Sequence, residues 1–180
     1  LGCDPDWILC GNGSDDLLTI ATRAFLEPGD RVRFANPSYV LYRTLAEIQG
    51  GQCDVVSYQA DWSLGPAFTA GDARLKLAYL ANPNSPSGTA LAPQQVAEIA
   101  DALPCPLVVD EAYVDFADNH CISLVAENEK VLVTRSLSKS YALAGLRFGF
   151  LVGQPHIIEQ LSKIKDSYNC DALSIAGATA

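Results

Sequence analysis

The sequence predicts an α/β fold in which a mostly parallel sheet has helices on both of its faces. Segments typical of strands alternate along the chain with segments typical of helices, an order that favours parallel strands joined by crossover helices. Residues 106–109 form a continuous apolar run that ends at the carboxylate Asp110, as expected for a strand buried on both faces. The 180 residues, 49% of them hydrophobic, suffice for one sizeable core, so we expect a single domain.

The first half of the chain contains one helix with clear boundary signals. Apolar residues recur at helical spacing over residues 14–26, with Ser14 as the expected N-cap and the turn residues 28–30 as the stop. A glycine turn at residues 11–13 precedes this helix. The other elements expected in this half are strands at residues 31–35, 53–58 and 75–80 and a helix at residues 39–48.

The second half continues the alternation. Its clearest strand ends in the carboxylate Asp110, and a later loop holds Lys139. Because ligands bind at the carboxyl ends of the strands in such sheets, we expect the site near these two residues. Residues 61–72 are the loosest stretch of the chain. The other elements expected in this half are helices at residues 93–103 and 155–167 and buried parallel strands at residues 131–134 and 148–152.

The charge and composition exclude several classes of function. A formal net charge of −9 disfavours a surface that collects nucleic-acid phosphates, although it is compatible with a local cationic pocket. The six cysteines include no pair at C-x-x-C spacing and the chain has only two histidines, so we expect no metal site. We expect the cysteines to be small buried hydrophobic residues in a reducing compartment.

No segment of the sequence indicates a membrane or a secreted protein. No apolar run approaches the roughly 20 residues that span a bilayer, and no signal peptide opens the chain, so we expect a cytoplasmic location. The chain has no methionine and stops within a segment typical of a helix. We therefore expect residues 1–180 to be a segment of a longer protein.

A lysine among small residues is the strongest chemical signal. Lys139 follows an expected buried strand and has Ser136 and Ser138 beside it. Arg147, eight residues further on, is a candidate anion clamp. A lysine is usually a solvated surface charge, but loss of solvent beside a second cation favours the neutral, nucleophilic amine.

This segment resembles the fold-type I enzymes that use pyridoxal 5'-phosphate (PLP), in which S-x-S-K is followed by G-x-R-x-G. The resemblance implies that Lys139 is the Schiff-base lysine. It also implies that Ser136, Ser138 and Arg147 hold the phosphate of the cofactor. A lysine that is a poor candidate by itself thus becomes the centre of the predicted site.

The segment V-D-E-A-Y at residues 109–113 adds two candidate catalytic residues, Asp110 and Tyr113. An aspartate that ends a strand is often only a turn former. In the superfamily, however, the matching aspartate pairs with the pyridine nitrogen and keeps it protonated, so that the ring can accept electrons. The resemblance implies this role for Asp110, and implies that Tyr113 donates a hydrogen bond to the cofactor's O3′.

The start of the first helix, G-N-G-S-D-D, is a candidate phosphate site because backbone N–H groups at helix N-termini bind anions. A capped helix after a glycine turn is common, so the resemblance carries this assignment. It places Ser14, Asp15 and Asp16 at the phosphate, with Asp16 where the superfamily usually has glutamate. It also implies that Tyr39 stacks on the pyridine ring; packing of Tyr39 on the domain's own surface is the alternative.

The loop N-P-N-S-P-S-G at residues 82–88 resembles a further motif of the superfamily. Most members have asparagine directly before the second proline, where it touches O3′ of the cofactor. This chain has Ser85 there, which is shorter and would reach O3′ through a water molecule. We therefore expect Tyr113 to carry more of that contact.

The motifs follow one another in the superfamily's order and most resemble those of the histidinol-phosphate aminotransferases. That resemblance implies transamination of histidinol phosphate with 2-oxoglutarate, in histidine biosynthesis. A PLP-dependent decarboxylase of the threonine-phosphate type shares this core and remains an alternative. A noncatalytic aminotransferase-like sensing domain is a third, although no DNA-binding segment is visible.

Members of the superfamily have an N-terminal arm and a C-terminal small domain, and they form homodimers. The resemblance implies that residues 1–180 are the PLP-binding large domain of a homodimer, without the arm and the small domain. We expect this segment to bind PLP but to transaminate slowly by itself. Its expected partners are a small amino donor, a 2-oxo acid and a second copy of the chain, and neither nucleic acid nor a membrane.

Overall fold

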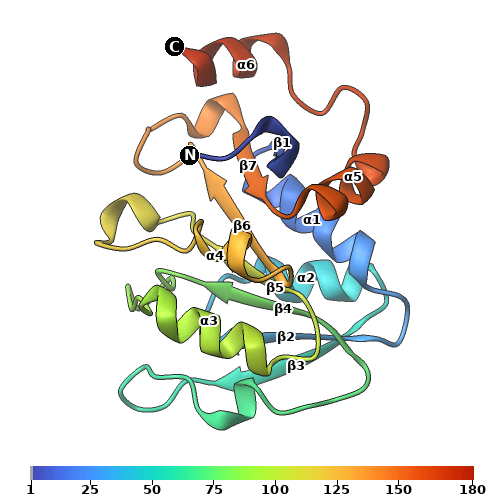
Figure 1. The fold of residues 1–180 in the computed structure, drawn as a ribbon, viewed down its shortest axis with the longest axis vertical. Helices are drawn as coiled ribbons and strands as arrows, with labels where there is room; N and C mark the ends of the chain where they lie inside the picture. The colour runs from blue at the N-terminus through green and yellow to red at the C-terminus, as the bar shows by residue number, and fades with distance from the viewer. Residues whose placement is uncertain (1) are drawn as a thin grey trace.

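A seven-stranded sheet organises the chain in the computed structural model, which describes residues 2–180 (Figure 1). Across the sheet, the strands follow the order β1-β7-β6-β5-β4-β2-β3. The strands are β1 (Ile8–Asn12), β2 (Arg31–Asn36), β3 (Gln52–Ser57), β4 (Leu75–Ala81), β5 (Leu107–Asp110), β6 (Val131–Ser136) and β7 (Phe148–Val152).

Strands β6, β5, β4, β2 and β3 run parallel, which confirms the predicted α/β class with a mostly parallel sheet. The other edge differs from the prediction in two ways. Strand β7 pairs antiparallel with β6, so the expectation of a parallel strand at residues 148–152 was wrong. Strand β1, which pairs antiparallel with β7, was not predicted, because its Cys10, Gly11 and Asn12 are not typical of strands.

The predicted helices are present in the predicted order, and each is shorter than predicted. Helix α2 starts after residue 40 and α5 stops before residue 165. The α-helices are α1 (Ser14–Phe25), α2 (Leu41–Ile48), α3 (Pro93–Ala102), α4 (Leu124–Glu127), α5 (Pro155–Ile164) and α6 (Ala172–Thr179), and the 3-10 turns are η1 (Pro5–Trp7), η2 (Pro66–Phe68), η3 (Val114–Phe116) and η4 (Ala144–Leu146).

The N-cap of α1 is Gly13, and Ser14 is the first helical residue, so the prediction of Ser14 as the N-cap was wrong. Gly13 has a φ of 80°, in the region that favours glycine. A Cβ atom at this position would lie 2.5 Å from Nη2 of Arg147. The positive φ therefore favours glycine here, and a Cβ atom would also displace the flexible end of the Arg147 side chain.

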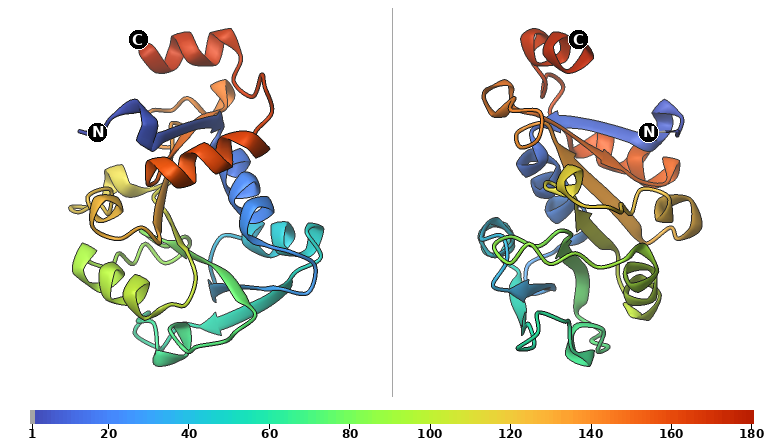
Figure 2. Two further views of the ribbon diagram at one scale, coloured as in Figure 1. Left: turned by 45° about the vertical axis from the view of Figure 1, so that its right-hand side comes forward. Right: turned by 90° about the vertical axis from the view of Figure 1, so that its left-hand side faces the viewer.

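Helices cover both faces of the sheet and form two apolar clusters with it. One cluster, under α1, α2 and α5, includes Leu17, Tyr42 and Leu161. The other, under α3 and α4, includes Val96 and Leu124. Helix α6 lies apart from both, beyond the β1 edge of the sheet in both views of Figure 2.

Residues 61–72, expected to be the loosest stretch, are anchored to the sheet. The Phe68 side chain is completely buried in the cluster under α3 and α4. The buried guanidinium of Arg33 donates hydrogen bonds to the carbonyl oxygens of Phe68 and Ala70, at 3.0 and 2.6 Å. These contacts hold the segment against β2.

No helix in the described part of the chain is long and apolar enough to cross a membrane.

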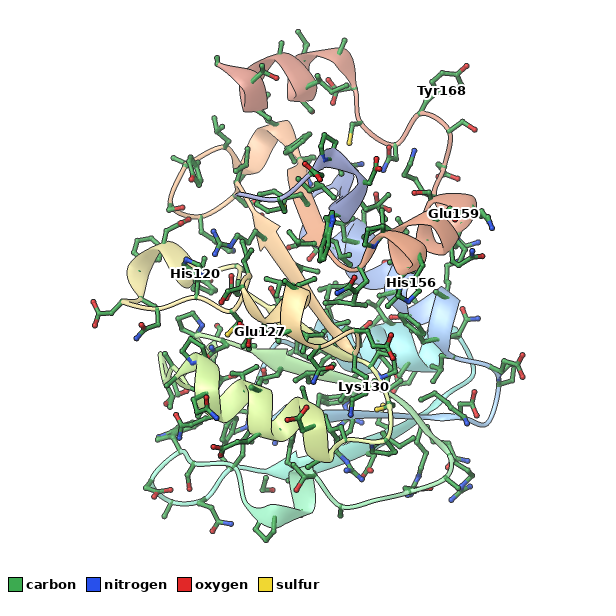
Figure 3. All side chains as sticks on the ribbon, in the orientation of Figure 1. His120, Glu127, Lys130, His156, Glu159 and Tyr168 are labelled. Carbon is green, nitrogen blue, oxygen red and sulfur yellow. The ribbon has the colours of Figure 1, made fainter. Side chains whose placement is uncertain are left out.

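Cys105 and Cys121 are buried as expected, but Cys10 is exposed, so the expectation of buried cysteines was wrong for Cys10. His120 and His156 lie on different sides of the molecule (Figure 3). Within residues 2–180, no group of three or more acidic, cysteine or histidine side chains is placed to hold a metal ion.

Candidate active site

A cavity of about 250 Å³ that opens to solvent lies at the carboxyl ends of β4, β5 and β6 and beside the start of α1. This is the position expected for a ligand site in an α/β sheet. Every predicted site residue except Asp16 lines it: Ser14, Asp15, Tyr39, Ser85, Asp110, Tyr113, Ser136, Ser138, Lys139 and Arg147.

Asp16 lies outside the cavity lining and has a local role. Its Oδ2 atom accepts a hydrogen bond from the backbone N–H of Asn12 at 3.0 Å. The carboxylate thereby fixes the turn that leads into α1. The structure does not bring the Asp16 side chain together with the other predicted site residues.

Asp110, the last residue of β5, presents a buried carboxylate that is only 5% exposed. Its Oδ2 atom accepts a hydrogen bond from the Tyr42 hydroxyl at 2.8 Å, and its Oδ1 atom accepts from the Ala112 N–H at 3.2 Å. None of the ion pairs among residues 2–180 includes Asp110. Asp110 is thus a buried acid that lacks a cation.

Burial raises the pKa of the Asp110 carboxyl above its usual range, because the charged form loses solvent. The hydrogen bond from Tyr42 opposes this effect, and the negative charge of Asp15 adds to it. A cationic ligand in the cavity would favour the ionised carboxylate. Asp110 is therefore a group in the cavity that could pair with a cationic part of a ligand.

Lys139 lies in the loop after β6 and lines the cavity, whereas none of the other four lysines of the chain does. Its Nζ atom is 5.3 Å from the centre of the Tyr113 ring, so the two predicted catalytic residues are neighbours. Lys139 is exposed, because the loop after β6 borders the open mouth of the cavity. The expected loss of solvent around this amine is therefore not present in this chain.

An arginine and several hydroxyl groups gather at the start of α1. Arg147 Nη1 is 3.5 Å from the Ser138 hydroxyl, and Nη2 is 3.6 Å from the Asp15 carboxylate. The Ser136 hydroxyl accepts a hydrogen bond from the Ser138 N–H at 3.1 Å. Together with the backbone N–H groups at the start of α1, Arg147 makes a local cationic pocket for an anion such as phosphate.

Tyr39 lies two residues before the start of α2, at the edge of the cavity. It is 38% exposed, and its hydroxyl donates a hydrogen bond to Asp15 Oδ1 at 3.1 Å. Partial burial, followed by the nearby Asp15 charge, raises the pKa of the Tyr39 hydroxyl to about 12. Tyr39 thus lines the cavity, and its stacking on a ring remains a prediction.

Two asparagines make the loop that carries Ser85 rigid. Asn82 Oδ1 accepts a hydrogen bond from the Leu91 N–H at 2.7 Å. The Asn84 amide donates to the Pro37 carbonyl oxygen at 3.2 Å and to the Ser87 hydroxyl at 2.9 Å. Ser85 lines the cavity in this anchored loop, and its water-mediated contact with the cofactor remains a prediction.

A buried ion pair links the ends of β5 and β6 and was not predicted. Glu111, whose side chain is 0% exposed, accepts a hydrogen bond from Arg135 Nε at 2.8 Å and another from the Cys121 N–H. Each partner is adjacent to a cavity residue, Glu111 to Asp110 and Arg135 to Ser136. The pair therefore holds the two strand ends in register beneath the cavity.

Tyr42 is a second residue that the sequence interpretation missed. Its hydroxyl reaches Asp110, although its ring belongs to the apolar cluster under α2. Tyr42 is three residues from Tyr39, so a helix would place both side chains on one face. This spacing could have indicated that Tyr42 lies near the site.

A lysine, a buried carboxylate and an arginine at a helix start, gathered at the strand ends of an α/β sheet, are typical of fold-type I PLP enzymes. The chain belongs to the aminotransferase class I and II family, whose family model matches residues 2–180. It is 57% identical over 176 residues to the histidinol-phosphate aminotransferase of Rhodopirellula baltica, with 98% of this chain and 49% of the relative covered.

A second relative is histidinol-phosphate aminotransferase 1 of Trichormus variabilis, 46% identical over 175 residues, with 97% of this chain and 49% of the relative covered. The chain thus spans about half the length of these curated relatives. The crystal structure of histidinol-phosphate aminotransferase from Sinorhizobium meliloti, in complex with PLP, matches with a TM-score of 0.92 and 30% identity, covering 99% of this chain and 50% of that one.

The L-threonine-O-3-phosphate decarboxylase from Porphyromonas gingivalis also has this fold, with a TM-score of 0.84 at 21% identity over 98% of this chain and 56% of that one. The fold is therefore shared by enzymes with different reactions. The choice among those reactions depends on the site and on the closer relatives.

Proposed function

We propose that residues 1–180 are the PLP-binding large domain of an aminotransferase that converts histidinol phosphate, with 2-oxoglutarate as the amino acceptor. The observation that carries the proposal is the cavity itself, which brings together Lys139, the buried Asp110 and the anion pocket at Arg147. Similarity to relatives named histidinol-phosphate aminotransferase supports the substrate.

The residues present fit PLP. Asp110, a buried carboxylate with no cationic partner among the described residues, would pair with the protonated pyridine nitrogen. Arg147, Ser138 and the start of α1 would hold the phosphate. Tyr39 would cover a face of the ring. Each part of the cofactor thus has a matching group in one cavity.

In this site PLP would supply the electron sink for a carbanion formed at the α-carbon of the substrate. Lys139 Nζ would be the group that holds the cofactor, because it is the one lysine among the described residues that lines the cavity. Once displaced by an amino substrate, this amine would move the proton at the α-carbon as general base and acid. Tyr113 would donate a hydrogen bond to O3′, and Asp110 would stabilise the protonated pyridine nitrogen.

The relatives extend well beyond this chain, so the activity of the whole protein is part of the proposal. We infer that the remaining part supplies an arm and a small domain that complete the substrate site. A homodimer and a cytoplasmic location remain predictions. We expect the chain alone to bind PLP and to perform half-reactions more readily than repeated turnover.

A single-turnover experiment tests the reaction. PLP-loaded protein mixed with histidinol phosphate is expected to yield about one equivalent of the ketone product per site without carbon dioxide, because transamination leaves the substrate carbon skeleton intact. Chromatography of the quenched mixture measures the ketone. Carbon dioxide released from a phosphorylated amino acid, with no ketone from histidinol phosphate, would instead identify a decarboxylase and contradict the proposal.

A further inference from the structure

The hydroxyl of Tyr42 donates a hydrogen bond to Asp110, although the Tyr42 ring is completely buried and does not line the cavity. We propose that Tyr42 is a positioning residue for the cofactor: its hydroxyl holds the Asp110 carboxylate in the orientation and the ionised form that the pyridine nitrogen requires. The inference rests on the proposed function and adds a residue of the fold's interior to the site.

The hydrogen bonds of Asp110 show why Tyr42 matters most among its partners. The Tyr42 hydroxyl donates to Oδ2 at 2.8 Å, whereas the Ala112 N–H and the Thr134 hydroxyl reach Oδ1 at 3.2 and 3.4 Å. All three donors bond the same carboxylate, so the shortest of these bonds, from Tyr42, is expected to be the strongest. Tyr42 is therefore the main fixed donor to this carboxylate.

The packing of the Tyr42 ring leaves its hydroxyl with little freedom. The ring stacks on Tyr79 with centres 4.7 Å apart and planes at 5°, and it meets the Tyr39 ring edge-on at 5.7 Å and 90°. Tyr39 is the residue proposed to cover the pyridine ring. Tyr42 thus contacts both residues that would bind the pyridine ring: Asp110 through a hydrogen bond and Tyr39 through ring packing.

The electrostatic surroundings give the hydrogen bond a measurable effect. Burial and Asp15 on α1 both disfavour the charged form of Asp110, and Tyr42 and Thr134 favour it. The side chains of Arg147, Lys139, Tyr39 and Tyr113 line the same cavity. Burial raises the pKa of the Tyr42 hydroxyl well above its usual value, so it remains a donor at neutral pH.

The sign of the pH effect follows directly. A neutral Asp110 cannot pair with a protonated pyridine nitrogen, so PLP affinity is expected to fall as the pH drops through the Asp110 pKa. Removing the Tyr42 donor raises this pKa further, because a hydrogen bond to the charged form is lost. The acid side of the binding profile then moves to higher pH.

Tyr42→Phe is the direct test, with Tyr79→Phe as the matched control. Both changes remove a buried hydroxyl and keep the ring, but the Tyr79 hydroxyl bonds Thr22 and the Leu18 carbonyl oxygen and not Asp110. PLP titrations at several pH values should show about tenfold weaker binding for Tyr42→Phe and a shift of its acid limb to higher pH. For Tyr79→Phe we expect a change of less than about twofold and no shift of the acid limb.

A double-mutant cycle with Asp110→Asn separates positioning from packing, because Tyr42→Phe should have almost no further effect on PLP binding once the carboxylate is gone. Equal losses in the Tyr42→Phe and Tyr79→Phe variants, or no loss in either, would overturn the role of Tyr42 and leave the proposed function standing. A wild-type chain that does not bind PLP would remove the proposed function, and with it this role.

Discussion

Lys139→Ala is expected to slow conversion of histidinol phosphate in a single turnover by about 1,000-fold or more, because it removes both the covalent attachment and the proton-transferring amine. The variant should still bind PLP through Asp110 and the anion pocket at Arg147, since these contacts do not involve the amine. Rapid-quench measurement of the ketone formed by PLP-loaded protein gives the rate.

Lys163→Ala is the matched control for this prediction. Lys163 lies on α5, outside the cavity, where its exposed amine pairs with Glu159 across one helical turn. Loss of that pair should leave the single-turnover rate unchanged, because surface pairs of this kind contribute little. A Lys139→Ala rate within about tenfold of the wild type would contradict the assigned role, since a single proton-transfer group is worth more than this.

Arg135→Leu is expected to lower the free energy of unfolding by about 3 kcal/mol, because it leaves the Glu111 carboxylate buried without its charged partner. Urea unfolding followed by circular dichroism measures the loss. The double variant Glu111→Gln, Arg135→Leu should recover much of it, since the uncompensated charge is then absent.

Arg43→Ala provides the comparison, because Arg43 pairs with Glu47 on the exposed surface of α2. Its loss should change the free energy of unfolding by less than about 1 kcal/mol. Similar losses for Arg135→Leu and Arg43→Ala would show that the buried pair does not stabilise the strand ends as we infer.

The parallel part of the fold was predictable because its signals are local. The run of apolar residues that ends at Asp110 and the helical spacing after Ser14 both appear within a few consecutive residues. Strand β1 was not predictable in this way, because its Cys10, Gly11 and Asn12 are not typical of strands. The direction of β7 also depends on pairing rather than on composition, so residues 148–152 carried no signal for it.

The candidate site also contains residues that were predictable from local signals and residues that were not. The predicted residues lie at strand ends and helix starts, which the fold class brings to one edge of the sheet. Tyr42 and the Glu111–Arg135 pair depend on tertiary packing, which the sequence does not reveal. The N-cap of α1 is Gly13 and not Ser14, because Gly13 adopts a backbone conformation with positive φ that the helical spacing did not reveal.

The central claim is that the chain binds PLP through Lys139, and borohydride reduction followed by peptide mass mapping tests it most directly. Reduction converts a Schiff base into a stable amine, so the cofactor mass marks the lysine that held it. The chain has five lysines, at positions 76, 130, 139, 163 and 165. We expect the label on Lys139 alone, with none on any lysine in Lys139→Ala. A label spread over the other lysines, or no label at all, would contradict the account.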